Sequence, residues 1–205
     1  MIDHLVYATP DLEASARDFG GRLGVSPAPG GQHVGRGTRN YLLSLGASSY
    51  LELIGPDLEQ PEFSGVRSMG LDTLDGPRLA AWAIHVPDME LAVDQARKRG
   101  YDPGPAHSMS RRQSDGQILN WKLTDVPGDV VPFLLPFLID WGDSLHPSQT
   151  APKGARMLEF RIESPDPEKI LNSLESLGIR VPVERGERPR LVATIEGPDG
   201  TVRLE

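Results

Sequence analysis

The side chains able to do chemistry in this chain are histidines, carboxylates and arginines, because the sequence contains no cysteine. The lack of thiols excludes thiolate zinc sites, iron–sulfur clusters, cysteine nucleophiles and a disulfide scaffold. The sequence also contains no Ser-His-Asp spacing, phosphate-binding loop, nucleotide-binding fingerprint or EF-hand. Imidazole and carboxylate groups remain, which suit acid–base chemistry or the binding of a divalent ion.

The elements that must position these groups come from a pattern that occurs three times. Each copy has a β-like run, a Pro-Asp pair and an amphipathic stretch that ends before a glycine. The pairs are Pro10-Asp11, Pro87-Asp88 and Pro165-Asp166, so the prolines lie 77 and 78 residues apart. The aspartates suit helix N-caps, and the glycines suit left-handed C-caps. Three short β-like runs follow each predicted helix. The sequence therefore predicts three βαβββ units over residues 1–56, 79–141 and 155–205.

With these three units, the sequence resembles the vicinal oxygen chelate superfamily, and within it a glyoxalase-like domain protein. The resemblance rests on residues 2–7 (Ile-Asp-His-Leu-Val-Tyr), residues 50–53 (Tyr-Leu-Glu-Leu), and residues 135–141 followed by 146–148 (His-Pro-Ser). It implies an α+β fold in which paired βαβββ modules form a cup-shaped mixed sheet with helices outside, together one compact unit. An unpaired third module could pack on the outside or make a homodimer, and the sequence leaves open which two modules pair.

The resemblance also implies a metal site, with one ligand on the first strand and a Glu on the fourth strand of each paired module. Carried over by position, the ligands are His4, Glu52, Glu159 and Glu205, whereas the second repeat offers Ala81 and Phe133. Strand alternation places all four ligand-type residues on the concave face. One imidazole and three carboxylates suit a divalent Mn, Fe, Ni, Co or Zn ion.

Two alternatives to this metal site stay open. Arg161 and Arg203 share the predicted face with Glu159 and Glu205, so ion pairs on a solvated sheet would explain those charges. If the first repeat pairs with the second, only His4 and Glu52 converge.

Other residues are candidates for holding a substrate inside the cup. The stretch from Arg111 to Gly116, which leads into Trp121, resembles a family segment that faces the cup. We expect Glu52 and Arg112 to be catalytic and Arg111 to bind the ligand, since an arginine can bind a substrate carboxylate through two parallel hydrogen bonds. The expected ligand-binding set is His4, Arg111, Trp121, Phe133 and Phe137. The alternative for the arginines is a solvated hairpin turn.

Two functions follow from these expectations. The first is a glyoxalase-like metalloenzyme, a lyase, isomerase or dioxygenase acting on a small oxygenated metabolite. The second is a metal-free small-molecule-binding protein of the same fold, of the resistance or sequestration type. The net charge of −8 argues against nucleic acid or an anionic membrane as the main partner. We expect a cytoplasmic protein, because residues 1–4 lack the features of a signal peptide and the longest apolar run is far shorter than the ~20 residues of a membrane helix.

Overall fold

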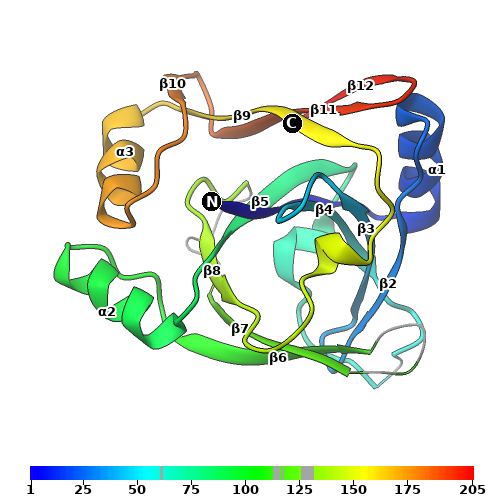
Figure 1. Cartoon of the computed structure of the whole chain (residues 1–205), viewed down its shortest axis with the longest axis horizontal. Helices are drawn as coiled ribbons and strands as arrows, with labels where there is room; N and C mark the ends of the chain where they lie inside the picture. The colour runs from blue at the N-terminus through cyan, green and yellow to red at the C-terminus, as the bar shows by residue number, and fades with distance from the viewer. Residues whose placement is uncertain (61, 113–115, 117, 126–131) are drawn as a thin grey trace.

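The first two repeats form one closed barrel of eight strands (Figure 1). The computed structural model describes residues 1–60, 62–112, 116, 118–125 and 132–205. The strand order around the barrel is β1-β4-β3-β2-β6-β7-β8-β5. The repeats join where β1 pairs with β5 and where β2 pairs with β6, both antiparallel. The first repeat therefore pairs with the second, which answers the question of pairing that the sequence left open.

The barrel elements have the following bounds. The first repeat contains β1 (Ile2–Ala8), α1 (Leu12–Leu23), β2 (Ala28–His33), β3 (Thr38–Ser44) and β4 (Tyr50–Pro56). The second contains β5 (Arg78–His85), α2 (Met89–Lys98), β6 (Ala106–Arg112), β7 (Ile118–Thr124) and β8 (Phe137–Asp140). Short 3-10 helices η1 (Ser68–Thr73) and η2 (Pro147–Gln149) lie in the connections.

The fourth strand of the second repeat lies further along the chain than we predicted. We expected the position that matches Glu52 at Phe133, in a β-like run over residues 130–135, of which 130 and 131 lie outside the described residues. The structure begins β8 at Phe137 instead. Pro132 and Pro136 lack the N–H that a strand ladder needs, so regular pairing starts only after them. Ala83 pairs with Phe137 as Val6 pairs with Glu52 in the first repeat. Phe137, and not Phe133, therefore occupies the position of Glu52.

The third repeat has the predicted order of elements but a different strand order. It contains β9 (Arg156–Ser164), α3 (Pro167–Ser176), β10 (Val183–Arg185), β11 (Arg190–Gly197) and β12 (Gly200–Leu204). These strands form a separate sheet in the order β10-β9-β11-β12. In the barrel repeats the fourth strand pairs with the first, whereas β12 pairs with β11.

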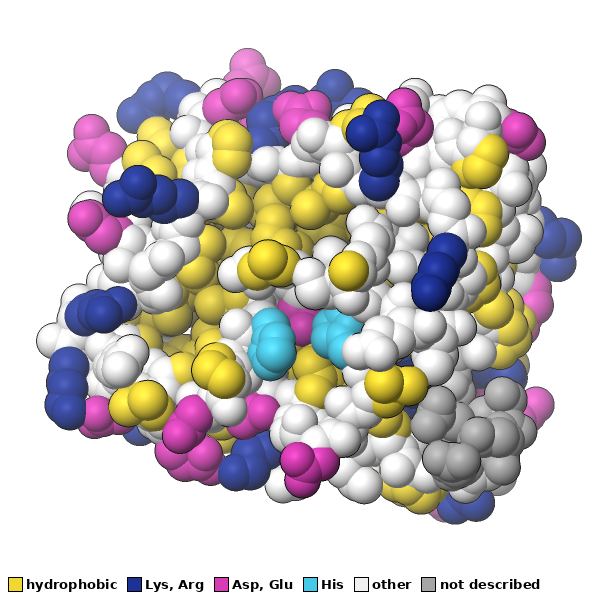
Figure 2. All heavy atoms as spheres, viewed as in Figure 1, with side chains coloured by type: hydrophobic (Ala, Val, Ile, Leu, Met, Phe, Trp, Pro, Cys, Tyr) yellow, Lys and Arg dark blue, Asp and Glu magenta, His cyan; other side chains and the backbone are white. Residues whose placement is uncertain are grey.

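The third sheet packs its apolar face on the outside of the barrel. The ring of Phe160 on β9 lies 5.0 Å from that of Trp82 on β5, and both belong to one buried core with Leu5 and Leu191. Figure 1 shows this sheet crossing one side of the barrel, with α1 and α3 near its two ends. Figure 2 shows hydrophobic side chains along the junction and charged ones around its rim. The third unit thus packs on the outside, one of the two expected alternatives.

The helix ends follow the repeated motif. Asp11 accepts a hydrogen bond from the N–H of Ala14, and the corresponding aspartates cap α2 and α3 in the same way. The glycine after each helix has a left-handed backbone, with φ of 74° at Gly24. The predicted caps are confirmed. None of the helices in the described parts of the chain has the length and apolar character needed to cross a bilayer.

Candidate functional site

The interior of the barrel holds a cavity of about 760 Å³. Its polar lining includes five buried side chains, those of His4, His33, Asn40, Glu52 and Arg111. Alternation along each strand sends these side chains inward, while Leu5 and Leu51 face the outer core. The expectation that His4 and Glu52 share the concave face is therefore confirmed.

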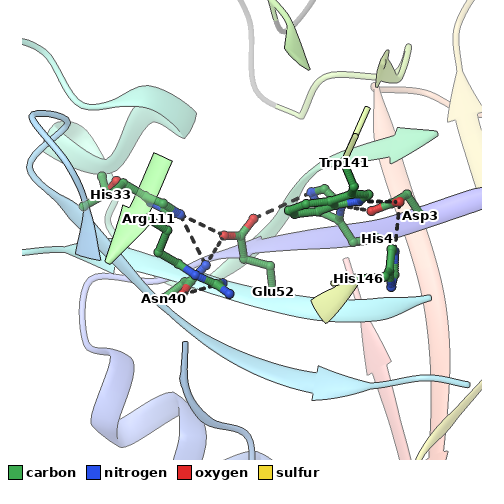
Figure 3. Close-up of polar contacts among 9 residues, drawn as sticks. Asp3, His4, His33, Asn40, Glu52, Arg111, Trp141 and His146 are labelled. Atoms are coloured by element: carbon green, nitrogen blue, oxygen red, sulfur yellow. Dashed lines mark hydrogen bonds and ion pairs between the residues drawn. The ribbon is translucent and has the colours of Figure 1, made fainter. Parts of the chain in front are cut away.

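An amide separates the two charged groups at the base of the cavity. Asn40 donates a 2.6 Å hydrogen bond from Nδ2 to Oε1 of Glu52, and its Oδ1 accepts one of 3.4 Å from Nη1 of Arg111 (Figure 3). All three side chains are buried. Burial lowers the pKa of Arg111, although an arginine keeps its proton in proteins. The cavity thus contains a carboxylate and a guanidinium that are linked through Asn40.

Gly30 on β2 gives these side chains room. A Cβ atom at this position would collide with Oδ1 of Asn40 and would lie 2.9 Å from Nη1 of Arg111. The absence of a side chain at residue 30 therefore lets the amide and the guanidinium meet.

His33 flanks the other side of the Glu52 carboxylate from His4. Its Nε2 lies 3.5 Å from Oε1 of Glu52, and its Nδ1 is 2.9 Å from Oγ1 of Thr38. Burial lowers the pKa of His33, an effect that the charge of Glu52 opposes and that of Arg111 reinforces. The ring is consequently neutral near pH 7 and can both donate and accept a hydrogen bond.

His4 is held by a carboxylate behind it. Its Nδ1 lies 2.6 Å from Oδ1 of Asp3, and its Nε2 lies 3.8 Å from Oε2 of Glu52 in the cavity. Burial would raise the pKa of Asp3, but hydrogen bonds from His146 and His4 outweigh it and hold that pKa well below its usual range. Asp3 is therefore ionised, and Nδ1 of His4 donates to it.

The same carboxylate ties the segment after β8 to the barrel. Nε1 of Trp141 donates to Oδ2 of Asp3 at 3.0 Å, and Nε2 of His146 lies 3.0 Å from the same oxygen (Figure 3). Asp3 is fully buried. Its two oxygens thus connect the cavity histidine to the connection between the barrel and the third sheet.

Aromatic and apolar side chains form the walls. Tyr50 stacks on His4 with ring centroids 4.6 Å apart, and Phe137 forms a T-shaped pair with the same imidazole. Trp121 and Trp141 lie 5.4 Å apart between centroids, and both line the cavity. An apolar or aromatic ligand body would find matching surfaces there.

The long connection between the repeats also reaches the cavity. Phe63, Ser68 and Met69 line it, and all three lie between β4 and β5. Met69 has a left-handed backbone, with φ of 60°, and is buried. This link therefore contributes to the binding surface.

The structure brings together some of the predicted site residues. His4, Glu52, Arg111, Trp121 and Phe137 line the cavity. Arg112 is exposed, because neighbouring strand residues point to opposite faces and Arg111 points inward. Phe133 lies before β8, is half-buried, and donates its N–H to the carbonyl oxygen of Ala80. Neither Arg112 nor Phe133 is part of the cavity lining.

Glu159 and Glu205 do not converge with His4 and Glu52. Both lie in the third unit, where Glu159 pairs with Arg161 at 2.6 Å and Glu205 with Arg203 at 2.7 Å. Carrying positions over from the first repeat assumed a strand order that the third sheet does not have. Ion pairs on a solvated sheet, the alternative left open by the sequence, describe these two residues.

The donor set does not fit the four-ligand metal site that the resemblance implies. The second repeat provides Ala81 and Phe137 at the matching positions, and neither side chain can bind an ion. His33 lies on the other side of the Glu52 carboxylate from His4 (Figure 3). Within the described residues, no group of three or more His, Asp or Glu side chains has a metal-binding arrangement. His4 and Glu52 alone make an incomplete chelate.

Three important residues escaped the sequence analysis. Asp3 should point outward by alternation, but the pairing of β1 with β5 shifts between Ile2 and His4, and this irregularity accompanies its contact with His4. Asn40 belongs to no sequence motif that would mark it as part of a site. His33 lies in a β-like run of the first repeat, and nothing in that run indicates that the closure of the barrel between β2 and β6 buries the side chain.

The fold resembles that of two solved structures, and a third structure matches with a lower TM-score. A hypothetical protein from Staphylococcus aureus matches with a TM-score of 0.63 and 16% identity, over 100% of this chain and 84% of that one. A mutant 4-hydroxymandelate synthase from Streptomyces coelicolor matches with a TM-score of 0.51 and 17% identity, over 99% of this chain and 61% of that one. Methylmalonyl-CoA epimerase from Mycobacterium tuberculosis has a TM-score of 0.44 and 22% identity, over 68% and 86% of the two chains.

The family follows from the sequence itself. No curated protein matches the chain. The model of the glyoxalase-like domain matches residues 2–178, which include the whole barrel and the start of the third unit. The chain therefore belongs to the glyoxalase-like domain family.

Proposed function

We propose that this protein binds a small organic molecule inside the barrel and does so without a four-ligand metal centre. The observation that carries the proposal is the cavity of about 760 Å³, which combines aromatic walls with a buried polar group at its base. Binding sites for small molecules in proteins have this combination of apolar lining and few, convergent polar groups. The alternation of the barrel strands supplies both.

An enzyme that uses acid–base chemistry is the second candidate function. The hydrogen bond from Nδ1 of His4 to Asp3 supports it, because it leaves Nε2 free to face Glu52 and a ligand. An imidazole and a carboxylate in one cavity can exchange a proton with a bound substrate, as a lyase or isomerase requires. A metal-dependent lyase or dioxygenase would need ligands that Ala81 and Phe137 do not provide.

A fragment screen with a blocked variant tests the binding proposal. Met109 on β6 is half-buried and lines the cavity, so Met109→Trp should fill part of it. Ser108→Trp is the matched control, because the neighbouring side chain is exposed on the outer face of the same strand. Ligand-observed NMR should find fragments that bind the wild type and Ser108→Trp but not Met109→Trp. Equal binding to all three proteins would contradict the proposal.

A further inference from the structure

Two buried donors on one wall of the cavity lack an acceptor within the described residues. They are Nε of Arg111 and Nε1 of Trp121, and both side chains are more than nine-tenths buried. Arg111 on β6 pairs with Leu119, and Met109 pairs with Trp121 on β7, so the two donors are diagonal neighbours on the inward face. Leaving a buried donor without an acceptor is costly, so a ligand that supplies acceptor oxygens would relieve both groups.

The positive charge of Arg111 is also available to a ligand. Within the part of the chain that the structure describes, Glu52 forms its ion-pair contacts with His4 and His33 and not with Arg111. The amide of Asn40 stands between the carboxylate and the guanidinium, with one hydrogen bond to each. Asn40 therefore links the two groups without neutralising either of them.

We propose that Arg111 and Trp121 bind the carboxylate of a small organic acid whose aromatic or apolar body lies against the cavity walls. This inference rests on the proposed binding function and names its ligand class. A carboxylate offers only acceptor oxygens, and it matches the planar guanidinium better than a hydroxyl or an amine does. Phe137, Met109 and Trp141 supply apolar surface for the rest of the molecule.

A single negative charge suits the cavity better than two. Glu52 and the ionised Asp3 already lie in or behind it, and the exposed Asp125 also lines it. Of the two arginines among the described lining residues, Arg111 is buried and Arg36 is exposed. A monoanion would balance Arg111, whereas a phosphate dianion would add repulsion from the nearby carboxylates. A phosphate monoester therefore provides a test of whether the site selects carboxylates or any oxyanion.

The test compares benzoate with its neutral analogue benzamide, with benzylamine and with phenyl phosphate. Binding is followed by titration calorimetry on wild type, Arg111→Gln, Arg111→Lys and Arg112→Gln. Arg112→Gln is the matched control, since it removes the exposed arginine next in the sequence. Circular dichroism and thermal unfolding establish that each variant is folded. The comparison of benzoate with benzamide on the wild type needs no variant.

We expect benzoate to bind the wild type and Arg112→Gln about tenfold to a hundredfold more tightly than benzamide does, the range expected for a hydrogen bond to a charged group. Arg111→Gln should abolish that preference, and Arg111→Lys should keep part of it. If phenyl phosphate bound as tightly as benzoate, the site would accept oxyanions in general, and the choice of a carboxylate would be overturned. Equal binding of benzoate and benzamide would overturn the carboxylate inference but leave the binding proposal standing. If no probe and no fragment of the screen bound, both would fail.

Discussion

The carboxylate of Asp3 accepts a 2.6 Å hydrogen bond from Nδ1 of His4, the residue that follows it in the sequence. This contact fixes the tautomer of a histidine that faces the cavity. The same buried carboxylate also contacts Trp141 and His146, so Asp3 positions three side chains. The orientation of the cavity histidine and the attachment of the segment after β8 therefore depend on the same group.

Replacing Asp3 by Asn should destabilise the protein. The substitution removes the charge that three donors share, and we expect a loss of about 2–3 kcal/mol in the free energy of unfolding at neutral pH. Urea unfolding measures it, and Asp143→Asn, at an exposed aspartate of the same connecting segment, is the control. Because the pKa of Asp3 is lowered in the folded state, its contribution is complete above the unfolded value near 3.8 and is lost as the pH falls below it. The difference between wild type and variant should therefore shrink in acid. A constant difference down to pH ~3 would contradict this account.

Protonation of His33 should oppose folding. Burial lowers its pKa, so below its ordinary value near 6.5 the unfolded chain binds a proton that the folded protein resists. Stability is then present above that pH and falls as the pH decreases through it. Between pH ~7.5 and ~5.5, we expect the free energy of unfolding of His33→Gln to fall by about 1 kcal/mol less than that of the wild type. His85→Gln, at an exposed histidine at the end of β5, should behave like the wild type. Identical pH dependence in His33→Gln and the wild type would refute the assignment.

Adding one methyl group at Gly30 should disturb the base of the cavity. The new Cβ would collide with the Asn40 amide and press on Arg111, so Gly30→Ala should destabilise the fold by about 1–3 kcal/mol. Gly21→Ala is a control of opposite sign, because residue 21 is an exposed position of α1 with free space around it. That variant should gain about 0.5–1 kcal/mol from helix propensity. Thermal unfolding of both variants measures these changes. A Gly30→Ala variant as stable as the wild type would show that residue 30, Asn40 and Arg111 do not pack as described.

Metal content separates the proposed function from the metalloenzyme that the resemblance suggested. Ala81 and Phe137 occupy two of the four ligand positions. We therefore expect elemental analysis of the untagged protein to find no divalent ion at a one-to-one ratio to the chain. Incubation with Mn, Fe, Ni, Co and Zn before desalting should not change this result. A stoichiometric ion that a His4→Ala/Glu52→Ala variant loses would contradict the account.

Local patterns in the sequence were sufficient to predict most of the fold. The Pro-Asp pairs and following glycines set the helix ends, and alternation along β1 and β4 placed His4 and Glu52 inward. Both features depend on neighbouring residues only, which is why a single sequence reveals them. Arg111 and Arg112 were both expected in the site, and only Arg111 lines the cavity, because neighbouring strand residues point to opposite faces.

Long-range pairing could not be predicted in this way. The third repeat matches the others in element order, yet β12 pairs with β11 instead of the first strand of its unit. Glu159 and Glu205 lie away from His4 and Glu52 because the first repeat closes the barrel with the second and the third unit forms a separate sheet. His33 and Asn40 become part of the site only because β2 meets β6 and closes the barrel. Strand order is decided by packing across the whole molecule, and in this chain the third unit covers Trp82 on the outside of the barrel.

The position of a bound molecule tests the central claim most directly. The measurement is a crystal structure of the protein with the tightest-binding fragment from the screen. Our account predicts the fragment inside the barrel, in contact with Trp121 and with an acceptor oxygen at Arg111. A fragment seated elsewhere, such as the smaller pocket of about 220 Å³ beside α2, with the barrel cavity left empty, would contradict it.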